Sequence, residues 1–278
     1  MIEGIDFAGH NQIDYAGVAR AGKAFVCRYL SGVAWKDITL DELHAWNSHG
    51  VAVVFVWELG ATDAEQGYGR GVWDAQRASA QLRGLGVADL QPIYFAVDED
   101  TTFGPNLTGY FTGIRDTLGH SRVGVYGSYA VVGGAFDSGL VSYGWQTYAW
   151  SGGRWDSRAQ LQQYSNGQTL GSLTVDLDRA TSPDYAGWLP DSAAVPPTPP
   201  PTSSNEVNVS ALPTLTQGSS GQYVRNLQGL LLAAGRQLGL DGSFGPGTLA
   251  VLKAWQSAAG LTADGICGAR SWSTLLGV

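Results

Sequence analysis

Three consecutive acidic residues, Asp98, Glu99 and Asp100, follow the apolar segment PIYFAV at residues 92–97. Side chains alternate between the two faces of a strand, so Asp98 and Asp100 are expected on one face and Glu99 on the other. Their Cα atoms would lie roughly 6.5 Å apart, and two carboxyl groups this close cannot both ionise cheaply. Such a pair suits the hydrolysis of glycosidic bonds. Taken alone, the triplet also fits a solvated turn or a cation site.

Acidic residues follow other strand-forming segments in the same way. In a parallel βα barrel the carboxyl ends of the strands meet at one rim, where functional groups gather. Ion pairs are the alternative for some of these acids, because Glu58 can pair with Arg28, and either Asp176 or Asp178 can pair with Arg179. If the rim prediction holds, five candidate catalytic groups converge there: Asp6, Glu58, Asp98, Asp100 and Asp176.

Aromatic residues occur near the same strand ends, where a sugar ring could stack on them. We expect two or three of them to line a groove and the others to belong to the core. The candidates for substrate binding are Trp57, Tyr126, Trp150 and Tyr164, together with Gln163.

Short segments rich in strand-forming residues alternate with helix signals through the first 150 residues. Capping-box patterns at Thr39–Glu42 and Thr62–Glu65 predict helices after the second and third of these segments. Eight strands can close a barrel that side chains fill. The expected strands are 2–7, 23–30, 51–57, 92–97, 122–127, 145–150, 159–164 and 173–177.

The gaps between these segments indicate strand direction. Parallel neighbours need a crossover of about a dozen residues or more, which the first five gaps provide. The last two gaps are shorter, so the final three strands are expected to run as antiparallel hairpins. The sequence therefore predicts an α/β fold, an irregular TIM-like (β/α)5β3 barrel.

A proline-rich segment, PDSAAVPPTPPPT at residues 190–202, divides the chain. It should form an extended spacer, because its prolines cannot donate backbone hydrogen bonds. We assign residues 1–189 to the barrel, 190–208 to the linker and 209–278 to a small all-α domain of three helices. In that last part DGxxGxx[ST] occurs twice, at 241–248 and 264–271, and each Asp-Gly predicts a tight turn before a helix.

The formal net charge is −8, and the excess of acid lies in residues 1–190, which hold 12 basic and 20 acidic residues. This balance argues against a nucleic-acid partner. Membrane insertion is not expected, because no apolar run reaches about 18 residues. Cys27 and Cys267 predict buried thiols rather than a disulfide. The four histidines have no metal-ligand spacing, so we expect no metal and no cofactor.

Three segments carry a family resemblance: GIDFAGHNQID at 4–14, FAVDED at 95–100 and LQQYSNGQTLGSLTVDLDRA at 161–180. They resemble the family 25 glycoside hydrolases, the lysozyme-like muramidases. More closely, they resemble the related glycoside-hydrolase-like domain of actinobacterial and phage proteins. The resemblance covers about residues 2–189 and implies the five-helix, three-plain-strand barrel, with Asp6, Asp98 and Asp176 in the site.

Asp100 stands where the muramidases have a glutamate that acts as general acid. Aspartate is shorter by one methylene, or roughly 1.5 Å, and misplacement of about 1 Å can cost about a hundredfold in rate. Three alternatives follow from this difference. The cleft closes more tightly around Asp100, Glu58 supplies the acid, or the domain binds glycan without cutting it.

The C-terminal segment, about residues 212–276, resembles the three-helix peptidoglycan-binding module. Together the two resemblances predict a peptidoglycan hydrolase of the endolysin type that cleaves the β-1,4 bond from N-acetylmuramic acid to N-acetylglucosamine. In this hypothesis Asp100 or Glu58 protonates the leaving oxygen. Asp98 stabilises the cationic centre or the substrate's acetamido group as it attacks. Asp6 and Asp176 hold water and substrate.

The implied partner is bacterial peptidoglycan, and the protein is expected to be a monomer. The N-terminus has no secretory signal pattern, so we expect synthesis in a host cytoplasm and action on the wall after release. The main alternative is a non-catalytic glycan-binding protein on the same barrel. A second alternative, an amidase, usually needs a zinc site or a Cys/His pair, which the histidine spacing does not favour.

Overall fold

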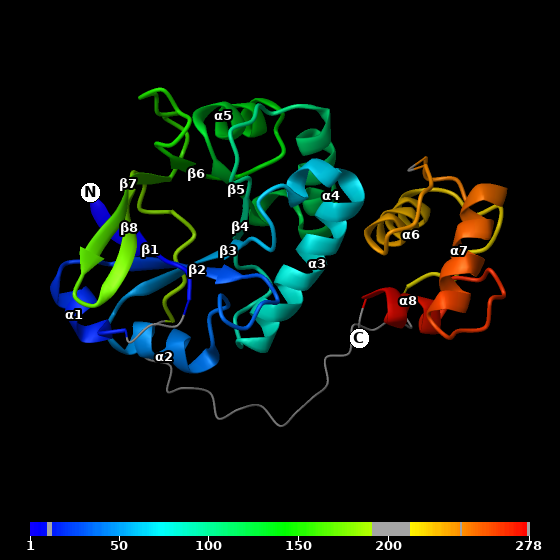
Figure 1. The fold of residues 1–278 in the computed structure, drawn as a ribbon, viewed down its shortest axis with the longest axis horizontal. Helices are drawn as coiled ribbons and strands as arrows, with labels where there is room; N and C mark the ends of the chain where they lie inside the picture. The colour runs from blue at the N-terminus through cyan, green and yellow to red at the C-terminus, as the bar shows by residue number, and fades with distance from the viewer. Residues whose placement is uncertain (10–12, 191–211, 240, 277–278) are drawn as a thin grey trace.

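The structure is a computed structural model that describes residues 1–9, 13–190, 212–239 and 241–276. Its N-terminal part is a closed barrel in which the eight strands are ordered as in the sequence (Figure 1). The strands are β1 Ile2–Asp6, β2 Phe25–Leu30, β3 Ala52–Trp57, β4 Ile93–Ala96, β5 Val123–Gly127, β6 Tyr143–Thr147, β7 Leu161–Leu170 and β8 Leu173–Ala180.

One α-helix follows each of the first five strands, and none separates the last three. The helices are α1 Tyr15–Arg20, α2 Leu40–Ser48, α3 Tyr68–Gly84, α4 Pro105–Leu118 and α5 Tyr129–Asp137, with short 3₁₀ turns η1 Asp63–Gln66 and η2 His120–Arg122. The predicted (β/α)5β3 barrel is confirmed.

Side-chain alternation divides the barrel into two cores. In β4, Ile93 and Phe95 point outward and pack with the helices, whereas Tyr94 points inward. Aliphatic residues and large aromatic rings fill the barrel interior, which leaves space for polar groups only near its ends. The inner cluster includes Phe25, Cys27, Val54, Val56, Tyr94, Trp145 and Leu161.

The predicted directions of the last strands are partly wrong. β7 and β8 form an antiparallel hairpin, and β8 is also antiparallel to β1, but β6 and β7 are parallel. The error came from the strand limits, because β6 ends at Thr147 and β7 begins at Leu161. The connecting segment 148–160 is therefore long enough to return along the barrel without a helix.

Only one of the two predicted capping boxes starts an α-helix. Thr39 accepts a hydrogen bond from the backbone N–H of Glu42 at the start of α2. The second pattern gives only η1, and α3 begins after Gly67, whose φ of 74° few other residues tolerate.

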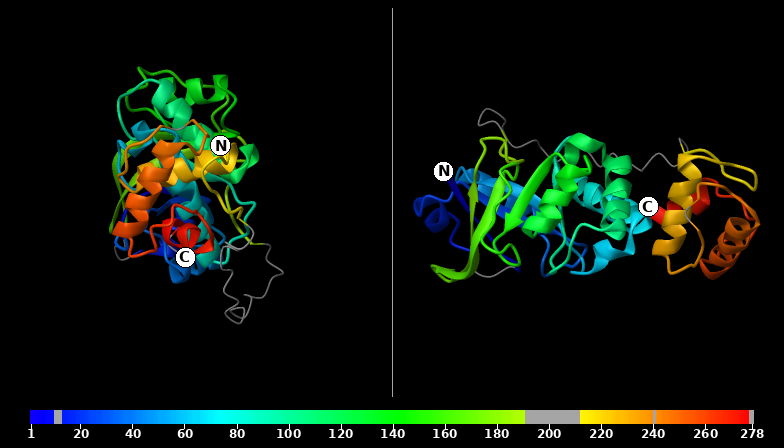
Figure 2. Two further views of the ribbon diagram at one scale, coloured as in Figure 1. Left: turned by 90° about the vertical axis from the view of Figure 1, so that its right-hand side faces the viewer. Right: turned by 90° about the horizontal axis from the view of Figure 1, so that it is seen from above.

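The C-terminal domain consists of the three predicted helices, α6 Gln222–Ala233, α7 Pro246–Ala258 and α8 Ala269–Leu276. The right-hand view of Figure 2 shows it at one end of the molecule, where α6 packs against α3. Cys267 is buried in its core and Cys27 in the barrel, and both thiols are free, as predicted. Among the described helices, none has the length and apolar character to cross a membrane.

Each of the two Asp-Gly turns of this domain is held by the same set of hydrogen bonds to a glutamine. The buried Gln228 amide donates to Asp241 Oδ1 at 2.8 Å and accepts from the Gly242 N–H at 2.9 Å. Gln256 makes the same contacts with Asp264 and Gly265, at 3.0 and 2.9 Å. Asp241 and Asp264 are exposed, but their carboxyl groups have a structural role because they fix each turn to a buried glutamine.

Helix α6 crosses α3 of the barrel at two glycines. A Cβ on Gly69 would lie 2.7 Å from the backbone oxygen of Gly229, closer than two such atoms can approach. Next to this crossing, Tyr68 donates a hydrogen bond of 3.2 Å to Asn226 of α6. Crossover helices begin at the carboxyl ends of the strands, so the first turn of α3 lies level with the barrel rim. The helical domain is therefore held beside that rim.

Replacing Gly69 with leucine is expected to separate the two domains, because the side chain has no space at the crossing. Small-angle X-ray scattering should then give a larger radius of gyration than for the unmodified protein. Gly84→Ala is the matched control on the same helix, where a Cβ would meet nothing within 4 Å. Identical scattering from the Gly69→Leu protein would show that the glycine crossing does not hold the domains together.

Candidate active site

Asp6 lies at the end of β1 and points into the barrel, where only 3% of its surface is exposed. Its partner in the antiparallel pairing with β8 is Asp176. The Gln163 amide donates to Oδ2 of Asp6 at 2.8 Å and to Oδ2 of Asp176 at 3.3 Å. The structure thus brings together Asp6, Asp176 and Gln163, although β1 is far from β7 and β8 in the sequence.

Asp178 is a fourth member of this cluster, and it was not among the five candidate catalytic groups. It is fully buried, and the Trp145 indole N–H donates to its Oδ1 at 2.8 Å. Burial and the nearby Asp6 carboxylate raise the pKa of Asp178 well above its usual value, which favours the protonated form of this carboxyl. Its spacing from Asp176 was the available signal, since residues two apart on a strand share a face.

The pKa of Asp6 is raised to about 7, first by burial and then by the charge of Asp176. The native state therefore binds a proton more tightly at Asp6 than the unfolded chain does. The resulting stabilisation is complete below the ordinary carboxyl pKa near 3.8 and is lost as the pH rises through about 7.

Asp6→Asn should remove the part of the pH dependence that comes from this carboxyl. Between pH 4 and 7 the free energy of unfolding of the unmodified protein should fall more steeply than that of the variant. Urea unfolding at a series of pH values measures this difference. Parallel curves for the two proteins would mean that Asp6 is not protonated in the native state.

Glu58 follows the last residue of β3 and forms an ion pair with Lys36, at 2.7 Å between Oε1 and Nζ. Lys36 also lies over the Tyr29 ring, 4.3 Å from its centroid. The alternative pairing of Glu58 with Arg28 is wrong, because Arg28 binds Glu42. Glu58 and Lys36 thus place one negative and one positive charge on the β2–β3 side of the mouth.

Arg28 instead fixes the chain that follows Asp6. Its guanidinium is fully buried, pairs with the Glu42 carboxylate, and donates to the backbone oxygens of Phe7 at 2.6 Å and Gly9 at 3.0 Å. The Trp46 indole N–H also donates to Glu42, at 3.1 Å. This buried network holds the end of β1 where Asp6 enters the site.

Asp98 is half-buried and follows β4 by two residues. Burial and the charge of Glu58 raise the pKa of Asp98, Asp176 adds to this, and Lys36 opposes it. Asp98 therefore feels charges from both sides of the mouth. A carboxyl group with a raised pKa that remains partly open to solvent can give its proton to a bound ligand.

Asp100 does not join the cluster, contrary to the prediction. It is exposed, and the carboxylates that raise the pKa of Asp98 are Glu58 and Asp176. The physical reason is that β4 ends at Ala96, so the alternation of side chains does not extend to residue 100. Glu99 points elsewhere, toward Glu65, whose charge adds to burial in raising the pKa of Glu99.

Two of the predicted substrate-binding aromatics point away from the mouth. Trp57 is buried in the outer core, 6.2 Å from the Trp73 ring, because inward and outward positions alternate along β3. Tyr164 donates to Glu3 on the outside of β1 at 2.7 Å. Neither can contact a ligand over the acid cluster.

The other predicted aromatics lie at the mouth. Tyr126 points inward and donates to Gln163 Oε1 at 3.0 Å, and its ring lies 4.6 Å from that of Trp145. Trp150 lies in the connection after β6, with 46% of its surface exposed. Tyr126 thus orients the Gln163 amide that binds two of the acids.

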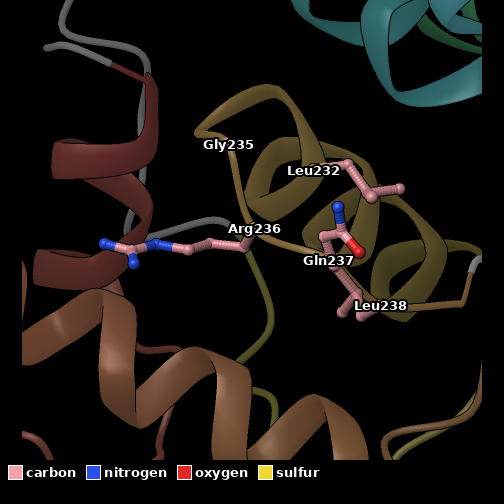
Figure 3. Close-up of a pocket in the computed structure, with 5 residues that line it drawn as sticks. All are labelled: Leu232, Gly235, Arg236, Gln237 and Leu238. Atoms are coloured by element: carbon pink, nitrogen blue, oxygen red, sulfur yellow. The ribbon is translucent and has the colours of Figure 1, made fainter.

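Among the described residues, no group of three or more histidine, cysteine or acidic side chains is arranged to hold a metal ion. A hollow of about 680 Å³ lies in the helical domain at the end of α6 (Figure 3). Its lining includes Leu232, Gln237 and Leu238, and the Arg236 side chain points away from these three. Its lining contains no acidic residue, so this hollow offers no carboxyl group for acid–base chemistry.

Two family models match the chain. Residues 16–181 match the family described as "Rv2525c-like, glycoside hydrolase-like domain", and residues 220–275 match "Putative peptidoglycan binding domain". The first match covers more than half of the chain and includes β2 to β8. The second covers α6, α7 and all of α8 except its last residue.

Individual relatives agree with these matches. The chain is 27% identical over 199 residues to "Putative peptidoglycan hydrolase Rv2525c" of Mycobacterium tuberculosis, covering 63% of this chain and 82% of that protein. The crystal structure of the Tat-secreted protein Rv2525c from M. tuberculosis with L-tartrate superposes with a TM-score of 0.62, covering 67% and 98% of the two chains.

A further relative is the zinc D-Ala-D-Ala carboxypeptidase of Streptomyces albus G, which is 42% identical over 98 residues, 32% of this chain and 38% of that protein. The predicted family resemblance and the predicted wall-binding module are both confirmed. The chain belongs to the family of Rv2525c-like, glycoside hydrolase-like domains and carries a peptidoglycan-binding domain after its barrel.

Proposed function

We propose that this protein hydrolyses the glycan strand of bacterial peptidoglycan at the β-1,4 bond from N-acetylmuramic acid to N-acetylglucosamine. The observation that carries the proposal is the convergence of carboxyl groups at the barrel mouth, four of them with raised pKa values: Asp6, Asp98, Asp176 and Asp178. The peptidoglycan-binding domain beside the rim supports the choice of polymer.

In the proposed reaction Asp98 is the acid. Its proton passes to the glycosidic oxygen as the bond from that oxygen to the anomeric carbon breaks. The charge of the Glu58 carboxylate stabilises the cationic sugar that develops. A water molecule then adds its oxygen to the anomeric carbon, and its proton returns to a carboxylate of the site.

The buried residues of the cluster position water and substrate and do not take part in bond cleavage. Asp6, Gln163 and Asp176 form a hydrogen-bonded chain below the mouth, and the buried Asp178 carboxyl lies beside Asp6. Asp176 is half-buried and also accepts from the Gly167 N–H at 2.8 Å. We assign to this chain the binding of water and of the substrate's polar groups.

The helical domain keeps the enzyme on its polymer. A wall-bound module raises the effective concentration of glycan at the mouth, which increases the overall affinity without any new contact in the site. A barrel that cuts glycan and a module that binds walls are what an endolysin of an actinobacterial phage requires, and we propose that role, with action on the wall after release from the host cytoplasm.

Reducing ends released from purified peptidoglycan test the proposal, with wall binding measured in the same samples by sedimentation. The enzyme should bind the walls and release reducing ends in proportion to time. Binding without release would favour the alternative, a glycan-binding protein on a hydrolase-like barrel. One observation favours this alternative: Asp100, which stands at the position of the expected general acid, is exposed.

A further inference from the structure

Exposed aromatic side chains in the described part of the barrel domain are confined to two loops. Trp35, Tyr148 and Trp150 are 61%, 44% and 46% exposed, and the remaining described tryptophans and tyrosines of this domain are buried or half-buried. Trp35 lies in the connection after β2, and the other two lie just after β6. An indole left in water is unusual, because burying such a side chain is strongly favourable.

The closed barrel places these two loops on opposite sides of its mouth. β6 is parallel to β5, and β1 to β5 are parallel to each other, so the loops after β2 and β6 emerge at the same end. In the order β1 to β8, three strands separate β2 from β6 in either direction. Strand spacing and tilt give an eight-stranded barrel a diameter of about 15 Å.

Contacts tie both loops to the acid cluster that lies between them. Next to Trp35, Lys36 forms the ion pair with Glu58. On the other side, the Tyr148 N–H donates to the backbone oxygen of Gln163 at 3.0 Å, and the Gln163 side chain binds Asp6. The aromatic groups therefore flank the cluster.

The backbone of Trp150 has an unusual conformation. Its φ is 53°, in the left-handed region that residues other than glycine rarely adopt. The buried Ser151 fixes this turn by donating to the Thr147 backbone oxygen at 2.6 Å and accepting from the Tyr129 N–H at 2.9 Å. Strain kept by surrounding contacts at an exposed side chain points to a binding role.

We propose that Trp35 and Trp150 are stacking platforms for sugar rings on opposite sides of the catalytic cluster. The glycan strand then crosses the mouth along the line from β2 to β6, and a productive substrate must be longer than a disaccharide to reach both platforms. This inference rests on the proposed function, because it takes an amino-sugar polymer as the ligand. The C–H groups on the face of a pyranose ring pack against an indole, whereas hydroxyl groups at the ring edge remain free for the polar residues between the platforms.

The test uses the full-length protein with Asp98→Asn, so that ligands bind without being cut. The probes are peptide-free chains of alternating N-acetylglucosamine and N-acetylmuramic acid, a dimer and a hexamer, with binding measured by calorimetry. Trp35→Ala and Trp150→Ala should each weaken hexamer binding by about tenfold, corresponding to about 1.4 kcal/mol. The double variant should bind the hexamer about as weakly as it binds the dimer. The affinity for the dimer should change little.

Leu90→Ala is the control, an equally simple truncation of a side chain that is 83% exposed and precedes β4 at the other end of the barrel. It should leave hexamer binding unchanged. Equal hexamer affinity with and without both tryptophans would overturn the platform inference while leaving the proposed function intact. Failure of the Asp98→Asn protein to bind the hexamer at all would overturn both.

Discussion

Asp98→Asn is expected to lower the rate of peptidoglycan hydrolysis about a thousandfold, within the range that general acids contribute. Asparagine keeps the shape of the side chain but has no proton to give to the leaving oxygen. In the unmodified protein the rate should fall as the pH rises through the raised pKa of Asp98, because only the protonated form acts as the acid. Reducing-end release from purified walls, with wall binding checked separately, measures the effect.

Asp100→Asn is the matched control, because it makes the same chemical change two residues away at an exposed carboxyl group. Its rate should stay close to that of the unmodified protein. The reverse pattern, a fast Asp98→Asn and a slow Asp100→Asn enzyme, would show that Asp100 moves into the mouth when substrate binds and acts as the acid.

Glu42→Gln is expected to destabilise the barrel by about 3–5 kcal/mol, the usual cost of leaving one partner of a buried ion pair uncompensated. The Arg28 guanidinium is fully buried, and the neutral amide offers it only one acceptor oxygen in place of two. Because Arg28 also binds the Phe7 and Gly9 carbonyls, activity should fall together with stability. The free energy of unfolding in urea measures the change.

Asp89→Asn provides the comparison. It breaks the ion pair of Asp89 with Arg83, whose side chains are 60% and 33% exposed. Exposed pairs contribute about 0–1 kcal/mol, so the two variants should differ clearly. A small loss for Glu42→Gln would mean that water or a neighbouring group reaches Arg28 in the variant.

The sequence was sufficient to predict the barrel, because strand-forming segments and crossover lengths are local features. Period-two alternation holds within β4 itself, where Tyr94 lies inside the barrel and Phe95 outside. What it could not give is where a strand stops. Asp100 was assigned to the face of Asp98 because side chains alternate along a strand, but β4 ends at Ala96. The sixth strand was also predicted too long, because β6 ends before Tyr148.

Which residues form the site depends on contacts between segments that are far apart in the sequence. Asp178 was missed because a neighbouring arginine offered a simpler explanation for it, whereas its partner is the Trp145 indole of another strand. Trp57 and Tyr164 were assigned to the mouth for being aromatic and near strand ends, although their positions in the alternation place them outside. Such errors are corrected only when the direction of each side chain is known.

Mass spectrometry of peptidoglycan digested by the unmodified protein and then reduced with borohydride tests the central claim most directly. Hydrolysis at the proposed bond predicts fragments that end in reduced N-acetylmuramic acid. Fragments that end in reduced N-acetylglucosamine, or free peptides beside intact glycan strands, would contradict it.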